Sequence, residues 1–518
     1  MLRSHSVKLA ILLLVLIITL ACRQSVQPLE IPTIVYNKPT TAQPATQTPD
    51  PTVSTYLLQV RSPGDLSITS PTPDTPRKLP QIRDEVDTYI VQLGDNLESI
   101  AVRYGITLQM LLEANQITNP DIIEVGQVLE IPAPIPGESG TGSKIIPDSE
   151  LVYGPLAQSF NVTAFVSRFD SYLSRYSEGV EGKTLTGAEV VKQVALDYSV
   201  NPRLLLAILE YQSGWVTMAN PPEDTLVFPI GIRDGWHASL YLQLAWAADM
   251  LNQGYYLWRV GGVAGWLLTT GEIVPADASI NAGTAGVQNL FALLNDRSGW
   301  DQAVSAEGLY KTFSNFFGYP FDYAWEPLIP EDIAQPEMQL PFEPGVDWAF
   351  TGGPHGGWGS GSAWAALDFA PGFNGLGCLQ SEVWVVAAAD GLIIRSDGGR
   401  VIEDLDGDGN EGSGWSIMYM HIEGRDRVEA GTRVKAGDHI GHPSCEGGYS
   451  TGTHVHLARR YNGEWIPADR VQEENGLPFN LEGWVSSGNG IEYDGLLERD
   501  GETVAAWEGF YPENTIRR

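Results

Sequence analysis

The apolar residues change their spacing along the chain, and this change most limits the folds that the sequence can adopt. Between about 148 and 322 they recur at i, i+3 and i+4, as in "GAEVVKQVALDYSV" and "NPRLLLAILEYQSGW", which predicts amphipathic helices. From about 340 onward, strand-like runs such as "WSIMYMHI" and "HVHLARRYNGEW" lie between Gly-rich turns, which predicts an all-β region. A chain of 518 residues also exceeds one ordinary core, so we expect a multidomain protein.

The first 86 residues are predicted to lie before the folded domains. Residues 1–22 hold a basic lead, the apolar run "LAILLLVLIITLA" and Cys22, which indicates an export signal rather than a comfortable membrane span. "TLAC" resembles a bacterial lipobox, which implies a lipidated Cys22; ordinary cleavage and an uncleaved anchor are the alternatives. All three place the remainder outside the cytoplasm. Residues 23–86 are rich in Pro, Thr, Ser and Gln, which predicts a disordered, extended tether.

Residues 87–133 form a compact unit with the predicted order strand, helix, helix, strand. A Gly-Asp pair precedes the first helix, Asn115 ends the second, and Gly126 precedes the last strand. From Tyr89 to Pro132 the unit resembles a LysM (βααβ) domain. That resemblance implies binding to the N-acetylglucosamine backbone of peptidoglycan or chitin; an interaction module with another ligand is the alternative. Residues 134–147 are a Gly-, Ser- and Pro-rich linker.

The mostly α-helical region, 148–325, contains "YSVNPRLLLAILEYQSGW" and "INAGTAGVQNLFALL". These segments resemble lysozyme-like transglycosylases, which carry a glutamate directly before Ser as the general acid. Gln212 stands there in this chain, and an amide cannot donate and recover a proton as a carboxylic acid does. Glu210 lies two residues earlier, on a different helix face. We therefore expect a degenerate lysozyme-like domain that holds glycan or spaces its neighbours.

Histidine is concentrated in the predicted β region. Six of the eight histidines of the chain lie there: His355, His421, His439, His442, His454 and His456. In an extended strand, positions i and i+2 share a face, so His454 and His456 are predicted to point the same way. Catalytic zinc takes three protein ligands and leaves one position for water. Without a helical HExxH spacing, the ligands are expected from separate strands and a loop.

Three segments, 340–370, "YMHI" at 419–422 and 445–463, resemble lysostaphin-type (LytM) zinc endopeptidases, and most closely the β-lytic metallopeptidase and staphylolysin branch. Most of that wider family has its first histidine four residues before the aspartate, where this chain has Trp364. The β-lytic branch sets it thirteen residues upstream in a Gly-rich loop, as His355 stands to Asp368. The resemblance implies three zinc ligands and two catalytic histidines. The ligands would be His355, Asp368 and His456, and the catalytic histidines His421 and His454.

This assignment agrees with the chemistry that the residues allow. The site has no glutamate at the usual metalloprotease spacing, so an imidazole must accept the proton of the attacking water. A histidine pKa lies near enough to neutrality for that role, and a second histidine can stabilise the oxyanion. Which of His421 and His454 is the base stays open. His439 and His442 do not match ligand positions and are predicted to be surface or groove residues.

Two further features of the β region leave alternatives open. "DLDGDGNEGSG" alternates acidic oxygens at Asp404, Asp406 and Asp408, but position twelve from Asp404 is Trp415 rather than a glutamate. A solvated hairpin turn is favoured, with a calcium site as the alternative. An oxidising compartment permits a disulfide between Cys378 and Cys445, which the sequence does not decide. The predicted peptidase domain spans 326–475, followed by a β-rich tail at 476–518.

The predicted function is zinc-dependent hydrolysis of peptide bonds in bacterial peptidoglycan, outside the cytoplasm, by a lipid-anchored or secreted protein. The LysM unit would bind the glycan, and the peptidase domain would take the peptide stem or cross-bridge. The formal net charge of −33 argues against a nucleic-acid partner, and only the N-terminal anchor would touch a membrane. A non-catalytic wall-binding regulator is the first alternative, and a glycan-cleaving enzyme acting through the helical region is the second.

Overall fold

The computed structural model describes residues 77–92, 95–120, 122–372, 377–469 and 477–518. The predicted export signal, including Cys22, and the tether as far as residue 76 lie outside the described residues. The described chain divides into two compact units, residues 85–132 and the remainder. Among the helices that are described, none combines the length and the apolar character needed to cross a bilayer.

The first unit has the element order that the sequence predicts. Its elements are β1 (Asp87–Ile90), α2 (Leu97–Arg103), α3 (Leu108–Asn115) and β2 (Val128–Ile131). The two strands pair antiparallel, and Thr107 caps α3 by accepting the Met110 N–H. Asn115 ties α3 to β2, because its side chain donates to the Glu130 carbonyl at 2.7 Å and accepts the Glu130 N–H at 2.7 Å.

The second unit begins with a helical region. Its helices are α4 (Asp148–Leu151), α5 (Val162–Val166), α6 (Tyr172–Arg175), α7 (Gly187–Tyr198), α8 (Pro202–Ser213), α9 (Leu240–Arg259), α10 (Ala282–Ala292), α11 (Arg297–Ala303) and α12 (Leu309–Phe317), with 3-10 turns η1 (Glu223–Thr225) and η2 (Pro320–Tyr323). Its short strands are β3 (Ile135–Pro136), β6 (Gly265–Leu267) and β7 (Glu272–Pro275), which form one sheet, and β4 (Ser177–Val180) and β5 (Lys183–Thr186), which form a hairpin.

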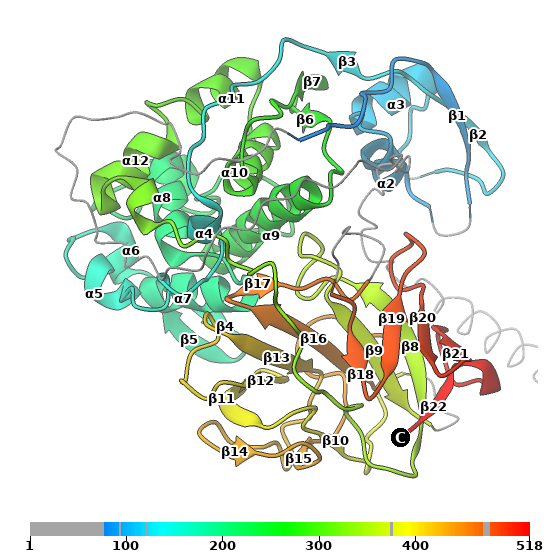
Figure 1. Ribbon diagram of the computed structural model, residues 1–518. Coiled ribbons are helices and arrows are strands. Elements are labelled where there is room, and N and C mark those ends of the chain that lie inside the picture. Colours follow the sequence, from blue (N-terminus) through cyan, green and yellow to red (C-terminus); the bar gives the residue numbers. More distant parts are fainter. Residues whose placement is uncertain (1–76, 93–94, 121, 373–376, 470–476) are drawn as a thin grey trace, which may run out of the picture. The chain divides into compact units, whose positions relative to one another are not determined.

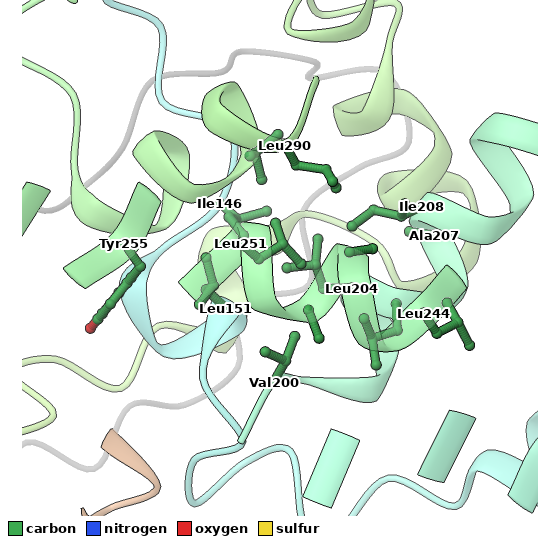
Figure 2. Close-up of a cluster of buried hydrophobic side chains, with 14 of the residues drawn as sticks. Ile146, Leu151, Val200, Leu204, Ala207, Ile208, Leu244, Leu251, Tyr255 and Leu290 are labelled. Carbon is green, nitrogen blue, oxygen red and sulfur yellow. The ribbon is translucent and has the colours of Figure 1, made fainter. Parts of the chain in front are cut away.

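Helix α8 lies at the centre of this region. Asn201 caps its first turn, Pro202 occupies a position where no N–H is needed, and Gly214 ends it at φ +69°. Its leucines are fully buried in a cluster that α9 and α10 share, and Figure 2 shows Leu204 there with Leu251 of α9 and Leu290 of α10. Helices α9 and α10 approach each other closely at Gly254 and Gly286, where glycine leaves room for the neighbouring backbone. A Cβ at Gly286 would lie only 2.6 Å from the Leu251 carbonyl oxygen.

The β region follows in the same unit. Its elements are β8 (Asp347–His355), β9 (Ala366–Pro371), β10 (Val385–Val386), β11 (Gly391–Asp397), β12 (Arg400–Asp404), β13 (Trp415–Met420), β14 (Arg433–Val434), β15 (His439–Gly441), β16 (Val455–Tyr461), β17 (Glu464–Trp465), β18 (Asn480–Leu481), β19 (Trp484–Ser487), β20 (Leu496–Arg499), β21 (Glu502–Ala505), η3 (Pro512–Asn514) and β22 (Thr515–Arg517). The main sheet has the order β14-β11-β12-β13-β16-β9-β8-β22, with β17 paired to β16 (Figure 1). The last strand of the chain therefore belongs to the sheet that carries the predicted site.

The two faces of the main sheet have different neighbours. One face carries Val455 and Leu457 and packs into a core of its own. The other, here called the site face, is defined by Asp368, Ile402, Met418, His456 and Ala458, which the strand register places side by side. Ile402, Met418 and Ala458 belong to the same buried cluster as the helical region. The helical region thus packs on the face that bears the predicted zinc ligands.

Candidate metal centre

Strand ends bring the predicted site residues together. His355 ends β8, Asp368 lies within β9, and His456 is the second residue of β16, opposite Asp368 in the register. His421 directly follows β13, and His454 directly precedes β16. The pairing of β8 with β9 shifts register twice before His355, and such bulges re-aim side chains.

Three predicted ligand atoms converge in this structure. His355 Nε2 lies 2.9 Å from His456 Nδ1, and each nitrogen lies 3.2 Å from Asp368 Oδ1. Ligand atoms around a tetrahedral zinc ion at ~2.0–2.1 Å stand about 3.3 Å apart. Two imidazoles and one carboxylate are also the donor set that zinc prefers in catalytic sites. The three side chains therefore fit a single zinc ion with one position left for water.

The ring protons of the two ligand histidines point away from this cluster. His355 Nδ1 donates to the Gly353 carbonyl at 2.8 Å, and His456 Nε2 donates to the Gly357 carbonyl at 3.0 Å. The nitrogens that face Asp368 are therefore acceptors, as is typical of metal-bound histidines. Asp368 Oδ1 is buried and has no hydrogen-bond donor among the described residues. Converging lone pairs without donors favour a cation at the centre.

The charges of the cluster agree with that geometry. Burial opposes ionisation of Asp368, but His355 and His454 outweigh it and hold its pKa well below the usual range. Burial lowers the pKa of His355, yet the Asp368 carboxylate more than reverses this and raises it. Burial, aided by the charge of His355, lowers the pKa of His456. The ionised carboxylate thus favours positive charge at the point where the two rings meet.

His421 and His454 lie beside the cluster with their rings 4.4 Å apart. His454 Nδ1 donates to the Gly452 carbonyl at 2.8 Å, and His421 Nδ1 donates to the Glu446 carbonyl at 3.1 Å. His454 Nε2 is 3.7 Å from Asp368 Oδ2, so His454 and His456 point to the same carboxylate as the strand pattern predicted. Burial, followed by the neighbouring histidines, lowers the pKa of His421 to about 3, which keeps this ring neutral.

The backbone at His421 has a strained conformation that neighbouring residues stabilise. Its φ is 64°, in the left-handed region that side chains other than glycine rarely adopt. Ser444 donates to the His421 carbonyl from its N–H at 2.7 Å and from its hydroxyl at 3.0 Å. Strain of this kind persists where surrounding contacts enforce it, which is common at active sites.

Tyr493 and Glu492 contact the centre, although no spacing in the sequence singled them out. The Tyr493 ring stacks on the His355 ring at 4.3 Å and 20°, and its carbonyl accepts the Gly353 N–H at 2.6 Å. Glu492 Oε1 accepts the Gly356 N–H at 3.3 Å. Both residues come from the C-terminal segment for which the sequence predicted no role. Burial raises the pKa of the Tyr493 phenol above its usual value.

The remaining two histidines of the β region lie apart from the cluster. His439 is half exposed and stacks on Trp384 at 4.0 Å, as expected of a surface residue. His442 is buried, and its Nδ1 donates to the Val383 carbonyl at 2.8 Å. The prediction of a surface or groove position is therefore wrong for His442, because it packs under Trp384 instead.

The Asp404, Asp406 and Asp408 oxygens approach one another within 4.8 Å, but the turn itself uses them. Asp404 accepts the Gly407 and Gly409 N–H groups, and Asp406 accepts the Asp408 N–H. Asp408 accepts the Asn410 N–H and the Ser413 hydroxyl. These bonds describe a self-capped hairpin turn and give no support to a calcium site.

Cys378 and Cys445 form a disulfide with their Cα atoms 5.6 Å apart. The pairing that the sequence left open is thus present in the structure. It joins the segment before Ser381 to the one that carries Glu446, whose carbonyl holds His421. A disulfide is consistent with an oxidising, extracytoplasmic compartment.

Comparison with known protein families identifies three segments. A model described as "Peptidase family M23" matches residues 379–467, which include His421, His454 and His456. The β region belongs to peptidase family M23. A "LysM domain" model matches residues 89–132 and a "LasA, N-terminal domain" model matches residues 144–329. The helical region therefore matches the LasA N-terminal domain, and its lysozyme-like character stays a prediction.

Individual relatives of this M23 peptidase agree with the division of the chain into these three matched segments. Protease LasA of Pseudomonas aeruginosa (strain UCBPP-PA14) is 27% identical over 347 residues, 62% of this chain and 74% of that protein. Beta-lytic metalloendopeptidase of Achromobacter lyticus is 32% identical over 167 residues, 30% of this chain and 40% of that protein. N-acetylmuramoyl-L-alanine amidase XlyA of Bacillus subtilis (strain 168) is 49% identical over 51 residues, 10% of this chain and 17% of that protein. The chain is a zinc metalloendopeptidase of family M23 with a LysM domain, and His355, Asp368 and His456 are its candidate zinc site.

Proposed function

We propose that this M23 peptidase hydrolyses peptide bonds in bacterial peptidoglycan outside the cytoplasm. The observation that carries the proposal is the convergence of His355, Asp368 and His456 beside the His421 and His454 pair. The presence of a LysM domain in the same chain supports a cell-wall substrate. The domain limits predicted from the sequence, 87–133, 148–325 and 326–475, are part of this proposal.

The proposed ligands are His355 Nε2, Asp368 Oδ1 and His456 Nδ1. A zinc ion held there would acidify its water toward neutrality and polarise the scissile carbonyl. The protein supplies the proton carriers. His421 and His454 both keep a proton on Nδ1, so their Nε2 atoms are free to accept one from the attacking water.

The same two histidines suit the second half of the reaction. A ring that has accepted the water proton at Nε2 becomes a donor, which can stabilise the oxyanion and then protonate the leaving amine. The stem peptide or cross-bridge is the proposed substrate. Cleavage of its peptide bond would free one amino group and one carboxylate. The choice between His421 and His454 as first acceptor stays a prediction without a test in this structure.

The proposed role of the LysM domain is to hold the enzyme on glycan strands. A chain bound to an insoluble polymer experiences a high effective concentration of nearby peptides. The predicted export signal and tether, with or without lipidation of Cys22, would present the domains to the wall. The disulfide between Cys378 and Cys445 agrees with this location.

Two alternatives are weaker. A non-catalytic regulator would not need the complete set of ligands and acceptor nitrogens that the site presents. A glycan-cleaving helical region would need a carboxylic acid in place of Gln212, whose amide donates to the Ile230 carbonyl. Glu210 is no substitute, because its carboxylate accepts the Val216 and Thr217 N–H groups and the Thr217 hydroxyl.

Digestion of purified peptidoglycan separates the three functions. The enzyme should release free amino groups, and mass analysis of the fragments should locate the cleaved bond. A chelator should abolish the release, and added zinc should restore it. Release of reducing sugars instead would favour the helical region, and release of neither would favour a regulator.

A further inference from the structure

The loop between the first two candidate ligands rests on helix α9 of the helical region. This loop, residues 356–365, is called the ligand loop here. Asp249 on α9 accepts the Ser360 hydroxyl at 2.7 Å and the Gly361 N–H at 2.8 Å. Within the part of the chain that the structure describes, Asp249 forms no ion pair with a basic side chain. Its hydrogen bonds are therefore directed at the ligand loop.

Glycines let the ligand loop approach α9 closely. A Cβ at Gly361 would lie 1.9 Å from the Asp249 carbonyl oxygen, and one at Gly359 would lie 2.4 Å from Asp249 Oδ1. Gly359 also has φ +68°, a conformation that favours glycine. The glycines of this loop thus allow it to pack closely against a helix of another region of the chain.

The ligand loop is bonded internally, so its two ends are coupled. The Gly357 N–H donates to the Ala363 carbonyl at 3.0 Å, and the Trp358 N–H donates to the Ser362 hydroxyl at 3.0 Å. That hydroxyl in turn donates to the Gly359 carbonyl at 3.2 Å. A displacement at Ser360 or Gly361 would therefore also displace the start of the loop.

The start of the loop contacts a candidate ligand. The Gly357 carbonyl accepts the His456 Nε2–H at 3.0 Å, which leaves Nδ1 facing Asp368. Groups that hold the distal nitrogen of a metal-bound histidine fix its orientation, and their loss typically weakens metal binding by ~10–100-fold. The Gly357 carbonyl has this position, and Asp249 holds the middle of the loop that carries it.

We infer that Asp249 is a positioning residue of the metal centre, acting through the ligand loop on His456. In the full chain, helix α9 of the helical region then contributes to the metal centre in addition to packing on the site face of the sheet. The inference rests on the proposed role of His456 as a ligand. It adds a residue outside the M23 segment, 379–467, to those on which zinc binding depends.

The test measures zinc affinity of the full chain by competition with a chromogenic chelator. Asp249→Ala should raise the zinc dissociation constant about tenfold, since it removes both acceptors of the loop. Asp249→Asn retains one acceptor oxygen and should recover most of the affinity. Ser360→Ala, which alters the loop and leaves the helix intact, should weaken zinc binding in the same direction. The double variant Asp249→Ala/Ser360→Ala should be no weaker than Asp249→Ala alone, because both residues act through one contact.

Lys183→Ala is the matched control. It removes an exposed bridge of 3.0 Å to Asp397 that also joins the helical and β regions, and it should leave zinc affinity unchanged. With cobalt(II) in place of zinc, the visible absorption bands of Asp249→Ala should shift, while those of Lys183→Ala should match the wild type.

Wild-type zinc affinity in Asp249→Ala and Ser360→Ala would overturn the inference, and so would an equal loss in Lys183→Ala. Failure of the wild-type chain to cleave peptidoglycan would instead count against the proposed substrate. The zinc measurement does not depend on that activity, so the two failures can be told apart.

Discussion

The four histidines at the candidate metal centre each donate one ring N–H to a backbone carbonyl, at Gly353, Gly357, Gly452 or Glu446. The remaining nitrogens of these rings are lone-pair donors to a metal or acceptors for a proton. Because all four rings share this pattern, their positions distinguish the two ligand histidines from the two proton carriers. Of the four, only His355 and His456 meet at Asp368 Oδ1.

Gly352 gives Asp368 the space it needs beside the ligands. A Cβ at Gly352 would lie 2.8 Å from Asp368 Oδ2, so Gly352→Ala should push the carboxylate out of position. We expect zinc affinity to fall by about tenfold or more, measured by chelator competition. Gly235→Ala is the control, since a Cβ there meets no atom within 4 Å. Unchanged affinity in Gly352→Ala would show that Asp368 does not bind the metal as proposed.

Glu403 gives the β region a pH-dependent stability. Its side chain is fully buried in β12, accepts the Tyr419 hydroxyl at 2.5 Å, and leaves Oε1 without a partner among the described residues. Burial raises its pKa from 4.5 to about 8. Above pH 4.5 the unfolded state therefore loses this proton first, and the free energy of unfolding falls as pH rises to about 8.

Glu403→Gln keeps the shape and the Tyr419 hydrogen bond but cannot ionise. It should remove this loss, which is on the order of 4 kcal/mol between pH 4 and pH 9. Denaturant unfolding at several pH values measures the effect. A variant whose stability changes with pH as steeply as that of the wild type would contradict the assignment.

At the scale of elements, local patterns predicted some parts of the site and could not reach others. The His-x-His spacing predicted that His454 and His456 point the same way, and apolar periodicity at i, i+3 and i+4 predicted α8. The register shifts that aim His355 and the stacking of Tyr493 on it were not predictable. They depend on contacts between segments far apart in the sequence, which the spacing of neighbouring residues does not reveal.

Helix α7 and strands β11 and β12 meet at a buried charge. Asp197 is fully buried and accepts Arg395 at 2.9 Å, with Arg400 at 3.6 Å. Asp197→Ala would remove one carboxylate from two largely buried guanidinium groups, which keep Glu411 and Glu181 as partners, so we expect a loss of about 1–3 kcal/mol in the free energy of unfolding. Lys183→Ala removes an exposed bridge of the same interface and should cost at most about 1 kcal/mol. Equal losses would contradict the importance of the buried charge.

At the scale of the whole molecule, the helical region and the main sheet form one unit, while the LysM domain forms another. The sequence predicted a LysM unit, a mostly helical region and an all-β region, and the structure has these three classes of segment. It did not predict that the helices share a core with Ile402, Met418 and Ala458 on the site face. The spacing of these apolar residues is equally consistent with the core of an isolated sheet. The consequence is that zinc binding and the stability of the helical region should be linked.

Zinc content tests the central claim most directly. Wild-type chain, His456→Ala and His454→Ala are purified, dialysed against zinc-free buffer, and analysed for bound zinc per chain. The account predicts about one zinc ion in the wild type, near-complete loss in His456→Ala, and most of the zinc retained in an inactive His454→Ala. Equal zinc in the two variants, whether kept or lost, would show that the ligand and proton-carrying roles are assigned wrongly.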